Sequence, residues 1–210
     1  MKVQFHGEFN QEGYIRHHPW RGVEHDARGA YYNFKENPEL ISEVLEDFKE
    51  WGHYEAIPLF YEMLRWLNGP DSLLESNDCA LDGPHPNTIK AVDKPITCGG
   101  RLMVFFRNLK FNTSEQHIEW LLGGMEHYLS AAPGNALTYA QLSFFKTLYT
   151  QMPGGKDQQL GKEVVCEFWA WGDTEEEVME NFKLIVSNIF DALKKISDKI
   201  RELSATGSNS

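Results

Sequence analysis

The sequence lacks the features that identify several classes of protein. Its three cysteines, Cys79, Cys98 and Cys166, are odd in number and show no CxxC spacing, which argues against a disulfide framework and a zinc knuckle. No stretch approaches the roughly 20 apolar residues that a membrane-spanning helix needs. The first residues, MKVQFHGEFNQEG, have neither the basic start nor the apolar run of a signal peptide. We therefore expect a soluble, cytoplasmic protein.

Catalytic sequence motifs are also missing. The chain contains no GxSxG, Walker A, GxGxxG or HExxH pattern. Gly99-Gly100-Arg101 and Gly154-Gly155-Lys156 resemble anion-binding fragments. The first, however, leads into an expected strand, and the second has no Ser or Thr after the lysine. We assign no catalytic residue and expect no cofactor.

Positive charge is scarce, with 20 basic against 31 acidic side chains and a net charge of −11. Contacts to phosphate need clustered Lys and Arg, so nucleic acid is a poor partner for this chain. A basic protein is a better one, because opposite electrostatic fields accelerate encounter. Many proteins are acidic simply because net charge keeps them soluble. The net charge by itself does not distinguish this explanation from the binding of a basic partner.

The length and the apolar content indicate one domain over residues 1–204, followed by a flexible polar tail at 205–210. The predicted fold class is α+β, with a mixed or antiparallel sheet of about three to five strands under at least four helices. We expect strands at residues 3–9, 101–109 and 162–171. We expect helices at residues 39–50, 55–67, 113–132, 138–149 and 174–200. Residues 71–100, rich in Pro, Gly, Asn and Asp, are expected to form a long ordered loop.

The last strand and helix have the clearest pattern in the chain. An aromatic strand breaks at Gly172, and Thr174 with Glu177 forms a capping-box sequence. The apolar residues that follow recur in steps of four and three: Val178, Phe182, Ile185, Ile189, Leu193, Ile196 and Ile200. This seam predicts a long helix packed across the sheet, with a dimer interface as the alternative. A monomer and a homodimer both remain open.

A cluster of possible metal ligands lies near the N-terminus. His17, His18, His25 and Asp26 place three imidazoles and one carboxylate within ten residues, and such groups suit transition metals. Their spacing matches no metal motif, so we expect no metal site there. A metal-dependent small hydrolase built on these four residues is the alternative function.

Other residues are assigned from their local context. The acidic residues Glu75, Asp78 and Asp82 are the predicted contacts to a partner, although such residues also cap helices and turns. Arg107, inside an expected strand, is predicted to pair with a buried carboxylate. Trp169 and Trp171 share one face of their strand, where core packing is favoured over a stacking platform.

Four blocks carry a resemblance to a known family: SNDCALDGPHPN (76–87), GRLMVFFRNLKFNT (100–113), EWLL (119–122) and EFWAWGDTEEEVMENF (167–182). They resemble recurring blocks of bacterial polymorphic-toxin immunity proteins, whose members accompany restriction-endonuclease-like nuclease toxins. The resemblance covers the middle and the C-terminal part of the chain. It implies an α+β protein without enzymatic activity that binds a cognate toxin and blocks its active site or an essential surface. It places no inhibitory residue.

Overall fold

A mixed β-sheet forms the centre of the molecule. The computed structural model describes residues 1–8, 15–18, 25–26, 29–30, 34–154 and 158–207. The six strands of the main sheet in these residues follow the order β1-β7-β8-β6-β5, with β2 beside β7 as well. Their bounds are Lys2–Glu8 (β1), Arg16–His18 (β2), Leu74–Pro86 (β5), Ile96–Phe106 (β6), Thr138–Tyr149 (β7) and Gln159–Gly172 (β8). Strands β3 (His25–Asp26) and β4 (Gly29–Ala30) form a separate pair.

The direction of the strands explains why the sheet is mixed. β1 and β2 run parallel to β7 and pair with its first and second halves. The pairs β7–β8, β8–β6 and β6–β5 are antiparallel. The pairing of β1 with β7 joins two strands whose starts are more than 130 residues apart in the sequence.

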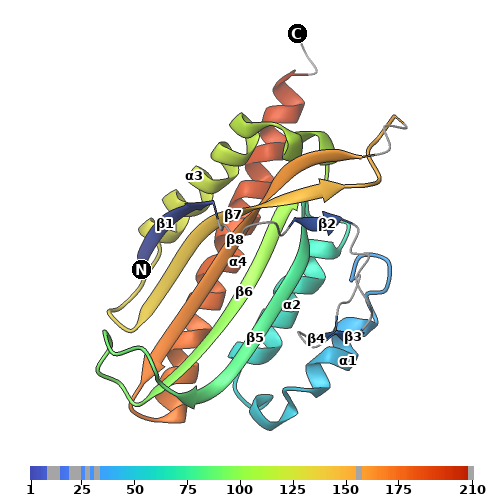
Figure 1. Cartoon of the computed structure of the whole chain (residues 1–210). Coiled ribbons are helices and arrows are strands. Elements are labelled where there is room, and N and C mark those ends of the chain that lie inside the picture. Colours follow the sequence, from blue (N-terminus) through green and yellow to red (C-terminus); the bar gives the residue numbers. More distant parts are fainter. Residues whose placement is uncertain (9–14, 19–24, 27–28, 31–33, 155–157, 208–210) are drawn as a thin grey trace.

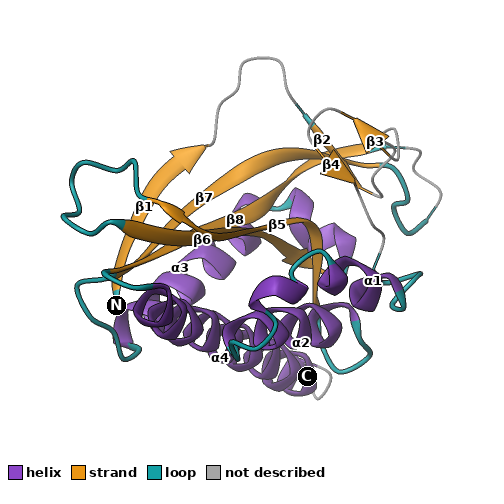
Figure 2. Cartoon of the chain, turned by 90° about the horizontal axis from the view of Figure 1, so that it is seen from below, coloured by secondary structure: helices purple, strands orange, loops and turns teal. Residues whose placement is uncertain are grey.

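Helices cover one face of this sheet. The described α-helices are α1 (Leu40–Glu46), α2 (Ala56–Asn68), α3 (Glu115–Ala131) and α4 (Glu175–Gly207). Figure 2 shows α2, α3 and α4 together on one side of the strands. Between the two layers lies the main apolar core, to which β6 contributes Leu102 and Val104 and β8 contributes Cys166 and Phe168. The predicted single α+β domain is confirmed, with a larger sheet than expected.

Helix α4 confirms the prediction made from its seam. Six of the seven seam residues, Val178 through Ile196, are at most 1% exposed, and the helix packs on β8, α2 and α3. The backbone N–H of Glu177 donates to Thr174 Oγ1 at 3.2 Å, and the N–H of Asp173 donates to Glu177 Oε2 at 2.7 Å. This reciprocal pair is close to a capping box. The helix continues to Gly207, so the tail predicted from residue 205 is partly helical, and residues 208–210 lie outside the description.

Two predictions of secondary structure are wrong. Residues 138–149, expected to be a helix, form strand β7. Residues 74–86, expected to belong to a loop, form strand β5 at the edge of the sheet. Its pairing with β6 shifts register between Ser76 and Cys79 and again between Asp82 and His85. Such irregularities at an edge accommodate the Gly, Pro and Asn residues that suggested a loop.

The second face of the sheet, opposite the helices, divides into two halves. Side chains of the covered half are at most 5% exposed, and they include Phe105, Phe145, Tyr149, Glu163 and Val165. In the open half, the side chains of Gln4, Tyr139, Gln141, Glu167 and Trp169 are partly or fully exposed. The first half is a small second core, whereas the other half is available for binding.

Candidate functional site

Strand β2 covers part of the second face. The guanidinium of Arg16 lies 5.4 Å from the ring centre of Phe145. The imidazole of His18 lies 4.5 Å from the ring of Phe105 and 5.7 Å from that of Tyr149. Burial, and secondarily the charge of Lys35, lower the pKa of His18 to about 4. This histidine is therefore neutral at pH 7 and serves as a packing group.

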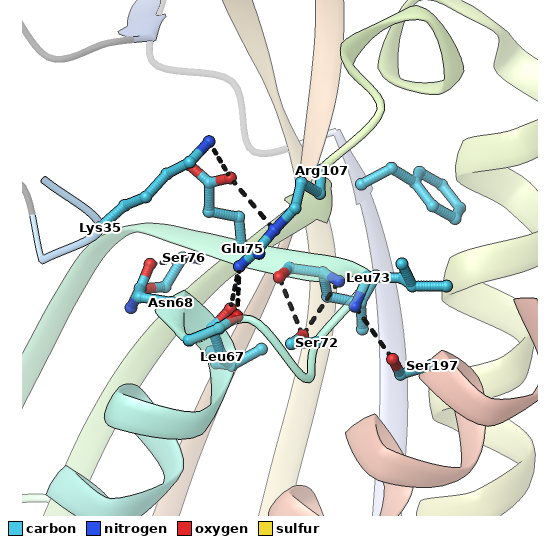
Figure 3. Close-up of polar contacts among 12 residues, drawn as sticks. Lys35, Leu67, Asn68, Ser72, Leu73, Glu75, Ser76, Arg107 and Ser197 are labelled. Atoms are coloured by element: carbon cyan, nitrogen blue, oxygen red, sulfur yellow. Dashed lines mark hydrogen bonds and ion pairs between the residues drawn. The ribbon is translucent and has the colours of Figure 1, made fainter. Parts of the chain in front are cut away.

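An ion network around the buried Glu75 joins β5 to the segment before α1 (Figure 3). The Glu75 carboxylate lies 2.8 Å from Lys35 Nζ and 3.7 Å from Arg107 Nε, and its side chain is only 3% exposed. Arg107 Nη2 also donates to the carbonyls of Leu67 and Gly69, at 3.1 and 2.8 Å. The predicted pairing of Arg107 with a buried carboxylate is confirmed. Glu75 is enclosed by these groups, so it does not offer the exposed partner contact that we expected.

Hydrogen bonds around this network connect the helices to the strands. Asn68, at the end of α2, donates to Ser76 Oγ at 2.8 Å. The backbone N–H of Leu73 donates to Ser197 Oγ of α4 at 3.0 Å. Such an enclosed set of polar groups stabilises the junction of α2, β5 and α4 and leaves little room for a substrate.

A second carboxylate is buried in the covered half. Glu163 is fully buried, and the amide of Asn77 donates to its two carboxylate oxygens at 3.1 and 3.3 Å. Burial, followed by the negative charges of Glu163 and Glu75, raises the pKa of Tyr149. The side chain of Tyr149 therefore stays in its neutral phenol form. The Tyr149 hydroxyl donates to the carbonyl of Lys162 at 2.9 Å. These contacts again describe a structural core.

The other two predicted partner contacts lie farther along β5. Asp82 is exposed, and His85 Nε2 lies 2.6 Å from its carboxylate. The side chain of Asp78 lies outside the described residues. Asp82 therefore remains a predicted contact, but the structure does not join it to Glu75 in one exposed surface.

The four residues of the alternative metal site are not seen to form a cluster in the described part of the chain. His17 and His18 are neighbours in a strand, where successive side chains point to opposite faces. The ring of His18 is enclosed by Phe105 and Tyr149. The side chains of His25 and Asp26 are not described. Among the described residues, no group of three His, Cys, Asp or Glu side chains could hold a metal ion.

Two acidic segments lie on the helical side of the molecule, one in α1 and the residues up to the start of α2, the other at the start of α4, with α2 between α1 and α4 (Figure 1). Residues 36–55 contain seven acidic side chains and one lysine, and residues 173–180 contain five acidic side chains and neither Lys nor Arg. We call these two segments the acidic surface. Most of its carboxylates are exposed: Glu36, Glu39, Glu43, Glu46, Asp47, Glu50, Glu55, Asp173, Glu176 and Glu180.

Local contacts hold the two segments together. Glu55 forms an ion pair with Lys183 of α4. Burial, followed by a hydrogen bond to Glu175 and the charges of Glu175 and Glu176, raises the pKa of Tyr54. A surface with this charge attracts a cationic partner and repels nucleic acid. The sequence analysis missed it, although the acidic residues of 39–50 already lay on the outer side of a predicted helix.

An apolar groove of about 420 Å³ lies between α3 and the C-terminal end of α4. Phe106, Phe111 and Ile200 lie in it, together with the partly exposed Trp120 and Leu203. The ring of His117 stacks on Phe111 with the centres 4.4 Å apart, and its Nδ1 bonds Ser114 Oγ at 2.8 Å. A single histidine with a hydroxyl at its side does not make a catalytic set.

Comparison of the chain with protein-family models, with curated proteins and with solved structures found no match. None of the described helices has the length and apolar character that crossing a bilayer requires. The surfaces described above are therefore the basis on which a function can be proposed.

Proposed function

We propose that this protein is an inhibitor that binds a basic protein partner through its acidic surface and neutralises it. The observation that carries the proposal is the concentration of twelve acidic residues in segments 36–55 and 173–180, which contain one lysine themselves, while Lys94 and Lys183 from outside them pair with Asp173 and Glu55. The two segments are far apart in the sequence and meet in the fold where Tyr54 and Glu55 contact α4. Like a nucleic acid, such a surface presents a dense array of negative charge.

The partner best suited to this surface is a nuclease toxin. A nuclease must hold phosphate, so its active site is commonly basic, and an acidic inhibitor competes for the same field. The resemblance to polymorphic-toxin immunity proteins points to the same class of partner. A metal-dependent hydrolase built on His17 and His18 finds no support in their placement, since the ring of His18 packs against Phe105 and Tyr149.

The proposal is tested with a nuclease toxin encoded beside this protein. Calorimetry at two salt concentrations should show submicromolar affinity that weakens as salt rises. The triple substitution Glu43→Lys, Glu46→Lys and Glu50→Lys should weaken binding by at least about 100-fold, because attraction becomes repulsion. Protection of DNA from the toxin should fall in parallel.

A matched control separates local from global charge. The substitutions Glu119→Lys, Glu126→Lys and Asp191→Lys also alter three exposed acidic residues. Each triple variant adds six positive charges and moves the formal net charge from −11 to −5. The control variant should keep its affinity within a few-fold. Equal loss in both variants, or no binding of the wild-type protein to any basic toxin, would contradict the proposal.

A further inference from the structure

The open half of the second face is built from two parallel rows of side chains. Pairing across β5, β6, β8, β7 and β1 places the residues of each row side by side. The aromatic row consists of Asp82, Gly99, Trp169, Tyr139 and Lys2. The polar row consists of Ala80, Arg101, Glu167, Gln141 and Gln4. Residues opposite one another in a sheet share a face, so these ten residues form one continuous surface.

The aromatic row provides a platform of two stacked rings. The rings of Trp169 and Tyr139 are stacked, with centres 5.7 Å apart and planes 26° apart. A Cβ at Gly99 would lie 3.0 Å from Trp169 Cδ1, so the absence of a side chain lets the indole lie against the strand. Lys2 Nζ lies 5.8 Å from the centre of the Tyr139 ring. The Trp169 and Tyr139 side chains are partly exposed.

The polar row provides planar hydrogen-bonding groups beside the platform. Gln141 Nε2 donates to Glu167 Oε2 at 3.2 Å, and the Tyr139 hydroxyl donates to Gln4 Oε1 at 3.0 Å. Burial raises the pKa of Glu167, against the opposing charges of Arg101 and His6. Amide and carboxylate groups arranged in this way both donate and accept hydrogen bonds.

The charge of this surface differs from that of the whole chain. Lys2 and Arg101 balance Asp82 and Glu167, whereas the protein carries a net charge of −11. A surface without net charge favours neither a polyanion nor a strongly basic protein. The ligand that fits is neutral, has an apolar ring face and carries many hydroxyl groups at its edge.

We propose that the open half of the sheet binds a neutral carbohydrate, with one sugar ring packed against the Trp169–Tyr139 pair. The aliphatic C–H groups on one face of a pyranose contact the aromatic rings. The hydroxyl groups at its edge reach Gln141, Glu167 and Gln4, which offer acceptors and donors in the neighbouring row. This function is separate from the acidic surface, since the two lie on different sides of the sheet and neither shares a residue with the other.

The test uses three neutral tetrasaccharides, maltotetraose, cellotetraose and chitotetraose, with the full chain. At least one should bind with a dissociation constant below about 1 mM by calorimetry. Binding should also shift the indole N–H signal of Trp169 in NMR spectra. The Trp169→Ala and Gln141→Leu variants should each bind at least about tenfold more weakly. The second variant removes no ring and so tests the polar row separately.

Trp120→Ala is the matched control, because Trp120 is a partly exposed tryptophan on the helical side of the molecule. It should bind the sugar like the wild-type protein. The proposal is overturned if none of the three sugars binds at about 10 mM. It is also overturned if affinity survives in both Trp169→Ala and Gln141→Leu, or if a single-stranded oligonucleotide binds this face in place of the sugars. None of these outcomes depends on the acidic surface, so the two proposals fail independently.

Discussion

The two halves of the second sheet face are made by the same strands and differ in what lies above them. Over one half, Arg16 and His18 of β2 pack on Phe145, Phe105 and Tyr149. The other half has Trp169 and Tyr139 at its surface. Aromatic residues in alternating positions therefore serve as core in one half and as a candidate binding platform in the other. The comparison shows that the aromatic side chains form a core where the short strand β2 covers them and reach the surface where it does not.

The largest expected difference between the halves is in stability. Phe105→Ala should lower the free energy of unfolding by about 3–5 kcal/mol, because Phe105 is fully buried and leaves a cavity. Trp169→Ala should cost only about 1–2 kcal/mol, since its ring is partly in water. Urea unfolding of both variants measures the two values. Similar losses would mean that the open half is as much a core as the covered one.

The same contrast is expected for two glutamates. Glu75→Ala should cost about 2–4 kcal/mol, because Lys35 and Arg107 lose the buried carboxylate between them. Glu167→Ala should stay within about 1 kcal/mol, since its surroundings are more hydrated. Thermal and urea unfolding at one pH compare the two. A Glu75→Ala variant as stable as the wild-type protein would show that this network does not hold β5 in place.

The smallest expected effect is the contribution of His18, in the covered half, to the pH dependence of the free energy of unfolding. The folded-state pKa of about 4 lies below the ordinary value of 6.5. The unfolded chain therefore binds a proton between these values while the folded chain does not, so stability falls as the pH drops from 6.5 toward 4. Between pH 7.5 and pH 5 this contribution amounts to about 2 kcal/mol.

A substitution isolates this contribution from that of the carboxylates. His18→Phe keeps a ring against Phe105 and Tyr149 and removes the titrating group. The variant should lose less stability than the wild-type protein between pH 7.5 and pH 5, by the same amount. His17→Phe is the control, because the His17 side chain is exposed. Parallel pH profiles for wild type and His18→Phe would refute the enclosed, neutral state of His18.

How much of this fold the sequence predicts depends on whether one face or two faces of an element are buried. Helix α4 has one apolar side, so its seam predicts both the helix and its packing. In β7 the first half buries Ala140 and Leu142 on the helical side, whereas the second half buries Phe145 and Tyr149 on the opposite face. Where the buried side changes, the apolar neighbours Phe144 and Phe145 pack in opposite directions. Consecutive apolar residues hide the two-residue period, which explains the wrong prediction of a helix.

The candidate sites are harder to predict than the helices and strands, because each site combines residues from distant parts of the sequence. The platform depends on register, which places Trp169 between Gly99 and Tyr139. Without strand β7 that neighbourhood does not exist, and core packing was the more reasonable interpretation of Trp169. The acidic surface likewise requires Tyr54 and Glu55 to contact α4, although about 120 residues separate them from its start. Charge counts alone do not supply this adjacency.

The pairing of β1 with β7 also imposes an order on biosynthesis. Lys2–Glu8 is made well before its partner strand, which begins at Thr138. During translation the N-terminal strand therefore waits for on the order of ten seconds, with its backbone hydrogen-bonding groups open to other chains. Strand β1 can pair only after more than 130 further residues have been made. In the folded protein the amino group of Met1 donates to the carbonyl of Ala132 at 3.1 Å, so this end of the strand is held beside the segment that leads into β7.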